Sequence, residues 1–210
     1  MLLREKIMFN VVTIAREYGS GGADIGRKVA ELLGWECVDK QIIEKVAAMG
    51  KVDPSWAEKA DEHTSSWWER VMKGFRYGGP EANFGEVITS ITDHDTLQQF
   101  TASVIEQAAN VGNCVIIGRS SQCVLRHHPH AFRVLVYAPL AEKLVRMKLR
   151  HPRENDLQGL LHRIDSERIR YARNYYGCDP FNIGLYHLCV NSTMGLDACA
   201  KLIVQAARLL

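Results

Sequence analysis

The stretch from residue 11 to residue 33 restricts the fold of this chain more than any other. An apolar, β-branched run at residues 11–15 leads into the turn Gly19-Ser20-Gly21-Gly22, which opens into a helical pattern over residues 25–33. A strand, a glycine-rich turn and a helix in this order direct several backbone N–H groups and the positive end of the helix at one point. Glycine lets the backbone close around an anion there, because no Cβ atom intervenes. We therefore expect a phosphate-binding turn.

The turn departs from the standard phosphate loop, which reads G-x-x-x-x-G-K-[ST]. Arg16 stands at the first glycine, Gly22 at the lysine and Ala23 at the residue whose hydroxyl binds magnesium. We expect Arg16 and Arg27, which flank the turn, to supply the missing positive charge. The alternative is a tight connection without a ligand, in which polar residues of the turn only cap the helix. The predicted phosphate-binding residues are Gly19, Ser20, Gly21, Gly22, Ala23 and Asp24.

Short apolar runs alternate with helical patterns along the rest of the chain. This alternation predicts an α/β fold, a three-layer structure with a parallel sheet and helices on both faces. The expected strands are residues 11–15, 35–38, 114–117, 132–137 and 188–191, and the expected helices are residues 25–33, 41–49, 96–109, 140–150, 157–175 and 196–209. Ligands of such folds bind at the carboxyl ends of the strands. We therefore expect the glycine turn, Asp39, Gly118-Arg119 and Ala138-Pro139 on one rim.

Charged residues near this rim are candidates for ligand binding. Arg119 follows an expected strand, and its planar guanidinium suits phosphate; an exposed loop arginine is the alternative. Asp39 either binds a ligand or begins the next helix. Asp165, Arg168 and Arg173 can share one face of the helix at residues 157–175, where ordinary surface ion pairs are the alternative.

Length and charge narrow the class of protein. A chain of 210 residues that is 47% hydrophobic can bury a substantial core, and we predict a single domain over residues 1–210 with a helical insertion at about residues 51–83. The net charge of +2 argues against a nucleic-acid binder. Residues 143–173 nevertheless carry nine basic and four acidic side chains. Such a local excess of positive charge suits a compact polyanion.

The six cysteines are scattered and include no C-x-x-C pair, which predicts reduced thiols without a disulfide or a zinc site. No apolar run is long enough to cross a bilayer, and the N-terminus lacks the apolar core of a signal peptide. These features predict a cytoplasmic protein. Residues 127–130, which contain three histidines, are expected to form a loop rather than a metal site. Trp67 and Trp68 are expected to pack within the insertion.

Taken together, these segments resemble the cytidylate kinase-like family, a branch of the P-loop nucleoside monophosphate kinases. The resemblance rests on residues 13–22 with Ile25-Gly26, including the missing lysine, on Val115-Ile116-Ile117-Gly118-Arg119, and on Asp165-Ser166-Glu167-Arg168. One position departs from the cytidylate kinases: they have Asp after the arginine of the Gly-Arg pair, where this chain has Ser120.

The resemblance implies phosphoryl transfer from ATP, with Mg²⁺, to a nucleoside monophosphate such as CMP or dCMP. The turn would hold ATP, and residues 150–175 would form a lid. Arg16, Arg168 and Arg173 would act on the transferred group, while Asp39, Arg119 and Asp165 would bind the acceptor. No residue is assigned as a metal ligand, although Asp24 and Asp39 are candidates for additional magnesium contacts. The expected partner is a small-molecule nucleotide, not nucleic acid or membrane, and a homo-oligomer is left open.

Two other functions compete with this one. A nucleotide-binding regulatory module without catalysis would explain the missing lysine, the missing hydroxyl and Ser120. A binder of larger polyanions would use the basic segment, although the near-neutral net charge disfavours it.

Overall fold

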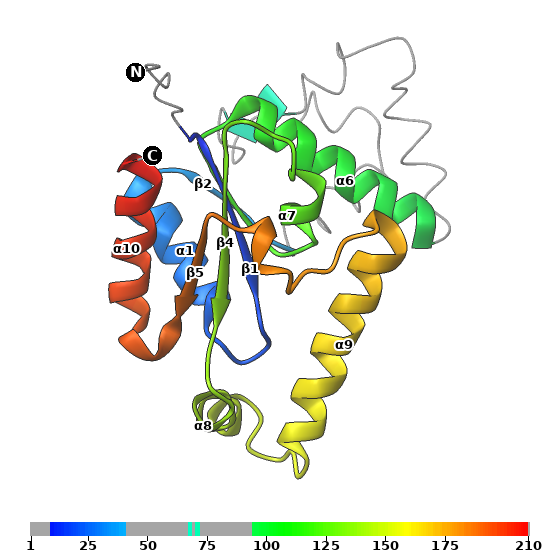
Figure 1. Cartoon of the computed structure of the whole chain (residues 1–210), viewed down its shortest axis with the longest axis vertical. Coiled ribbons are helices and arrows are strands. Elements are labelled where there is room, and N and C mark those ends of the chain that lie inside the picture. The colour runs from blue at the N-terminus through cyan, green and yellow to red at the C-terminus, as the bar shows by residue number, and fades with distance from the viewer. Residues whose placement is uncertain (1–8, 41–66, 69, 72–93, 210) are drawn as a thin grey trace.

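A computed structural model describes residues 9–40, 67–68, 70–71 and 94–209. Five parallel strands form one sheet in the order β2-β3-β1-β4-β5 (Figure 1). The strands are β1 (Val11–Arg16), β2 (Glu36–Val38), β3 (Cys114–Ile117), β4 (Ala131–Tyr137) and β5 (Leu188–Asn191). All five lie where the apolar runs predicted strands. The parallel sheet follows from runs that are apolar on both faces, since β1, β3 and β4 are almost wholly buried.

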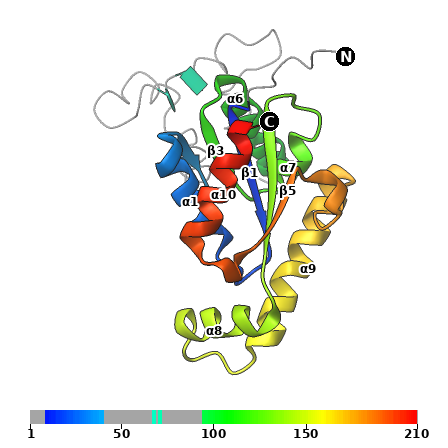
Figure 2. The ribbon, with the colours of Figure 1, turned by 60° about the vertical axis from the view of Figure 1, so that its left-hand side comes forward.

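Helices cover both faces of the sheet, which confirms the expected three-layer α/β fold. The described helices are α1 (Gly22–Leu33), α6 (His94–Val111), α7 (Ser121–Val124), α8 (Leu140–Arg150), α9 (Leu157–Tyr176) and α10 (Leu196–Leu209), with 3₁₀ turns η1 (Ile183–Leu185) and η2 (Ser192–Met194). Figure 2 shows α1 and α10 on one face and α6 and α7 on the other. Side chains alternate between the two cores along β1, because Val12 and Ile14 pack with α1 and α10 whereas Val11 packs with α6.

The segment between β2 and α6 carries two predictions that the structure tests only in small part. The expected helix at residues 41–49 and most of the insertion at residues 51–83 lie outside the described residues. Trp67 and Trp68 are buried in the core beside α6, as expected for packing side chains. The Trp67 indole donates a hydrogen bond to the carbonyl of Gly112 (2.6 Å), and the Trp68 indole donates one to the Glu36 carboxylate (3.1 Å). Both indole N–H groups therefore have a hydrogen-bond acceptor inside the core.

The structure contradicts the expectation that every cysteine is a free thiol. Cys123 of α7 and Cys178, which follows α9, form a disulfide across a sequence separation of 55 residues, with their Cα atoms 6.1 Å apart. No local spacing predicts this pair, because only the folded chain brings α7 against the end of α9. The other cysteines are free. The cysteine-based argument for a reducing, cytoplasmic location therefore fails.

None of the helices within the described ranges combines the length and the apolar composition needed to cross a membrane.

Removal of the disulfide is expected to lower the free energy of unfolding by about 2–4 kcal/mol, because the cross-link restricts the unfolded chain over a long loop. The double variant C123A/C178A tests this by urea denaturation. C189S, which replaces an exposed free thiol, is the control and should leave stability nearly unchanged. Equal stability of the double variant and the wild type would show that the two sulfurs are not joined in solution.

Candidate functional site

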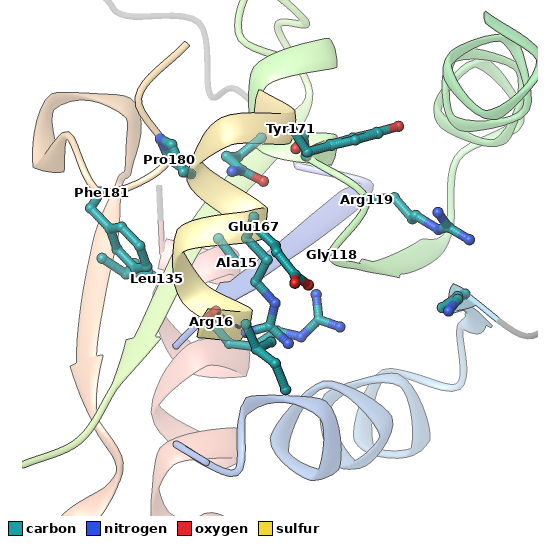
Figure 3. A pocket seen from close by; sticks show the side chains of 14 residues that line it. Ala15, Arg16, Gly118, Arg119, Leu135, Glu167, Tyr171, Pro180 and Phe181 are labelled. Atoms are coloured by element: carbon teal, nitrogen blue, oxygen red, sulfur yellow. Dashed lines mark hydrogen bonds between the residues drawn. The ribbon is translucent and has the colours of Figure 1, made fainter. Parts of the chain in front are cut away.

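A pocket of about 420 Å³ opens at the carboxyl ends of β1 and β3 (Figure 3). Its walls come from distant parts of the chain: the end of β1, the residues after β3, one face of α9 and the segment that follows the disulfide. This is the rim at which the parallel sheet predicts a ligand.

The pocket carries a concentrated positive charge. Arg16, Lys40, Arg119 and Arg168 line it, and Glu167 is the one acidic side chain among its described lining residues. Burial, followed by the neighbouring charges of Arg168 and Arg119, lowers the pKa of Arg16 to about 10. Burial also lowers the pKa of Arg168. Both guanidinium groups remain protonated at neutral pH, so the pocket favours an anion with several charges.

Two glycines make room for the Arg16 side chain. A Cβ atom at Gly118 would lie 1.6 Å from Arg16 Nη1, and one at Gly22 would lie 2.5 Å from Arg16 Cβ. Any other residue at these positions would displace the arginine. The glycine of the Gly118-Arg119 pair therefore serves to place Arg16, a role that its position after a strand did not reveal.

Arg168 and Asp165 fasten α9 to the segment between β1 and α1. Arg168 Nη1 donates hydrogen bonds to the carbonyl of Arg16 (3.0 Å) and to Asp165 Oδ1 (3.1 Å). The same carboxylate accepts a hydrogen bond from the Tyr18 N–H (2.8 Å), and the Arg168 guanidinium lies over the Tyr18 ring. Burial raises the pKa of Asp165, while these two partners act in the opposite direction. Asp165 does not line the pocket, so the structure places it as a support for Arg168.

The residues after β3 adopt an unusual backbone. Gly118, Arg119 and Ser120 are consecutive left-handed residues, with φ of 77°, 55° and 54°. The left-handed region costs a residue with a Cβ atom roughly 1–2 kcal/mol. Two such residues at the wall of a charged pocket indicate local strain at a functional site. Arg119 and Ser120 both line the pocket.

The glycine turn lies beside the pocket rather than in its wall. Gly19 and Gly21 are left-handed, and the Ser20 hydroxyl donates to the Glu17 carbonyl (2.8 Å). A Cβ atom at Gly19 or Gly21 would contact side chains of α8, α9 and α10. No described residue accepts a hydrogen bond from the amides of Gly19, Gly21 or Ala23. The turn thus retains free donors at the start of α1, as an anion site requires.

Helix α8 brings basic side chains to the glycine turn, and the sequence did not lead us to expect them there. Arg146 donates to the Ser20 carbonyl (2.9 Å) and to the Ser192 hydroxyl (2.8 Å), while Lys143 pairs with Glu17 (3.0 Å). Arg150 pairs with Asp24 (2.5 Å). The available signal was the basic excess of residues 143–173 together with the i, i+3, i+7 spacing of these three side chains, which places them on one helix face.

The remaining predicted residues lie in ion pairs. Arg27 pairs with Asp24 (3.0 Å) and with Asp39 (3.7 Å), so it neutralises carboxylates instead of facing the pocket. Arg173 pairs with Asp179 (2.8 Å) and is exposed outside the pocket. Its predicted catalytic role gains no support from this placement. Within the described ranges, no group of three or more His, Cys, Asp or Glu side chains is arranged to hold a metal ion.

Comparison with known proteins links this geometry to a family and to a fold. The sequence profile of the cytidylate kinase-like family matches residues 11–194. An uncharacterized protein from Eubacterium ventriosum has a similar structure, with 17% sequence identity, a TM-score of 0.68, and coverage of 94% of this chain and 97% of that chain. Shikimate kinase from Acinetobacter baumannii in complex with shikimate is 16% identical, with a TM-score of 0.50 and coverage of 95% and 93%. No curated protein is significantly similar in sequence.

The left-handed backbone at Ser120 predicts that Ser120→Gly stabilises the protein. The Ser120 hydroxyl does not cap α7, so glycine loses no hydrogen bond there. We expect the free energy of unfolding to rise by roughly 0.5–1 kcal/mol, the relief of strain being partly offset by the greater freedom of glycine in the unfolded chain. Ser166→Gly within α9 is the control and should lower stability by up to about 1 kcal/mol. A loss of stability in both variants would exclude strain at Ser120.

The crowding of positive charge predicts opposite effects of Arg16→Met on stability and on binding. Without a ligand, removal of a repelled charge should raise the free energy of unfolding by about 1 kcal/mol. Binding of ATP or inorganic phosphate, measured by calorimetry, should weaken at least tenfold. Arg163→Met, at an exposed position of α9, should change neither quantity appreciably. A destabilised Arg16→Met protein that binds phosphate normally would show that Arg16 has a structural role only.

Proposed function

Because the chain belongs to the cytidylate kinase-like family, we propose that it transfers a phosphoryl group from ATP to a small anionic acceptor, a nucleoside monophosphate such as CMP or dCMP. One observation carries the proposal: Arg16, Arg119 and Arg168, contributed by three separate segments, line a single pocket beside the glycine turn. Such a cluster of guanidinium groups suits phosphate oxygens better than it suits any neutral ligand.

Phosphoryl transfer demands little covalent chemistry from a protein. Its catalysis consists of holding the two substrates in line and of neutralising the charge on the phosphoryl oxygens. In the proposed reaction Arg119, which lines the pocket from the segment after β3, anchors the anionic group of the acceptor. Arg16 and Arg168 face the transferred group, because Arg168 is tied to the end of β1 by its hydrogen bond to the Arg16 carbonyl.

We propose that the donor phosphates bind at the glycine turn. The turn offers backbone N–H groups and the N-terminus of α1, and Lys143 and Arg146 of α8 lie against it. We propose that these two side chains take the place of the absent phosphate-loop lysine. Mg²⁺, when bound with the nucleotide, would neutralise charge on the phosphate oxygens. Asp24 and Asp39 are the candidates for contacts with it within the described part of the chain, and both already pair with Arg27.

A regulatory nucleotide-binding module is the second candidate. Two observations favour it: the turn lacks the hydroxyl that binds magnesium, and Arg146 is held by the Ser20 carbonyl and by Ser192. Such a protein would bind ATP without acceptor-dependent turnover.

A coupled ADP-release assay with ATP, Mg²⁺ and a panel of nucleoside monophosphates tests the proposal. CMP or dCMP should stimulate ADP release, and Arg119→Ala and Arg168→Ala should each lower kcat/KM by about a hundredfold or more, because each removes a preorganised donor. Arg170→Ala on an exposed position of α9 is the matched control, expected to remain within twofold of the wild type.

The result also separates the two candidates. ATP binding without ADP release for any acceptor would favour the regulatory module. Turnover that neither arginine variant changes would refute the roles assigned to Arg119 and Arg168.

A further inference from the structure

Gln122 is a buried polar residue in the wall of the arginine-lined pocket. It lies on the short helix α7, between the left-handed Ser120 and the disulfide-bonded Cys123, and it is 3% exposed. Both neighbours restrict the backbone of α7. The side chain of Gln122 is therefore presented to the pocket from a fixed support.

The hydrogen bonds around Tyr186 show which end of the Gln122 amide already has a partner. The Gln122 side chain forms a hydrogen bond with the Tyr186 hydroxyl, and because the Gln122 Oε1 atom has no hydrogen-bond partner in the described part of the chain, the NH₂ group is the donor. The Tyr186 hydroxyl in turn donates to the carbonyl of Pro180. Since Tyr186 uses its hydrogen on Pro180, the oxygen of the Gln122 amide cannot be the atom that faces Tyr186.

The amide oxygen of Gln122 has no hydrogen-bond partner in the described part of the chain. An unpaired buried acceptor of this kind destabilises a folded protein, and most buried polar atoms in folded proteins have a hydrogen-bond partner. A ligand donor in the pocket would satisfy it. Tyr171 and Phe181 line the same pocket, and Figure 3 shows them with Arg16 and Arg119 around this space.

We propose that Gln122 Oε1 determines acceptor specificity by accepting a hydrogen bond from an N–H or O–H group of the substrate. The inference rests on the proposed function to the extent that the pocket is the acceptor site. The acceptor class is then a molecule with an anionic group for the arginines and a neutral donor for Gln122, next to the aromatic side chains of Tyr171 and Phe181. An acceptor that turns a carbonyl oxygen toward Gln122 is rejected, because two acceptors then face each other without a hydrogen.

The test compares binding of three nucleotides to the intact protein by calorimetry. CMP carries an exocyclic amino group at the position where UMP carries a carbonyl. CMP also carries the 2′-hydroxyl that dCMP lacks. The wild type should bind CMP at least tenfold more tightly than UMP or than dCMP. A preference over UMP identifies the amino group as the donor, and a preference over dCMP identifies the 2′-hydroxyl. Gln122→Met, nearly equal in size but without the acceptor oxygen, should reduce that preference to within threefold.

A conservative variant separates this role from a structural one. Gln122→Glu keeps an acceptor oxygen and should retain the preference, and thermal unfolding confirms that each variant is folded. If Gln122→Met does not fold, the wild-type preference and its retention in Gln122→Glu decide. Equal binding of the three nucleotides to the wild type, binding of none, loss of the preference in folded Gln122→Glu, or its retention in folded Gln122→Met would overturn the inference. Failure of the proposed function has a different signature: the preference in binding is present, and acceptor-dependent ADP release is absent.

Discussion

The parallel pairing of β1 with β3 and β4 determines where the charged groups of this protein meet. Ile14 lies opposite Ile117, so β3 ends while β1 continues to Arg16, and the chain turns away at Gly118 just where the Arg16 side chain needs space. On the other side Arg16 pairs with Val136. This register, fixed by two apolar cores, delivers three segments to one rim. The pocket is thus a product of strand register as much as of its own residues.

Packing energy holds together groups that repel one another. Arg16, Arg119 and Arg168 are brought close although burial and mutual charge make the protonated state of Arg16 less favourable. Asp165 offsets part of this cost, because it is a partly buried carboxylate that accepts hydrogen bonds from Arg168 and from the Tyr18 amide. The residues that line the pocket therefore retain a net positive charge. A bound polyanion would balance this charge.

The sequence predicted the fold in detail, and it predicted the site only in part. Apolar runs and helical periodicity located all five strands and the helices α8 and α10, because burial on a regular element leaves a local pattern. Contacts between distant elements leave no such pattern. The Cys123–Cys178 pair, the placement of Lys143 and Arg146 against the turn, and the pairing of Arg173 with Asp179 all depend on how α7, α8 and α9 pack. The position of the glycine turn, beside the pocket and not in its wall, also depends on how these elements pack.

The disulfide closes part of the chain into a covalent ring. Because Cys123 and Cys178 are joined, β4, α8 and α9 belong to one closed ring of the chain. The ring closes at α7, beside the pocket, so α8 and α9 are joined to the rest of the protein through β4 at one end and through the disulfide at the other. A single break of the backbone inside the ring would leave two fragments that remain one molecule until the disulfide is reduced.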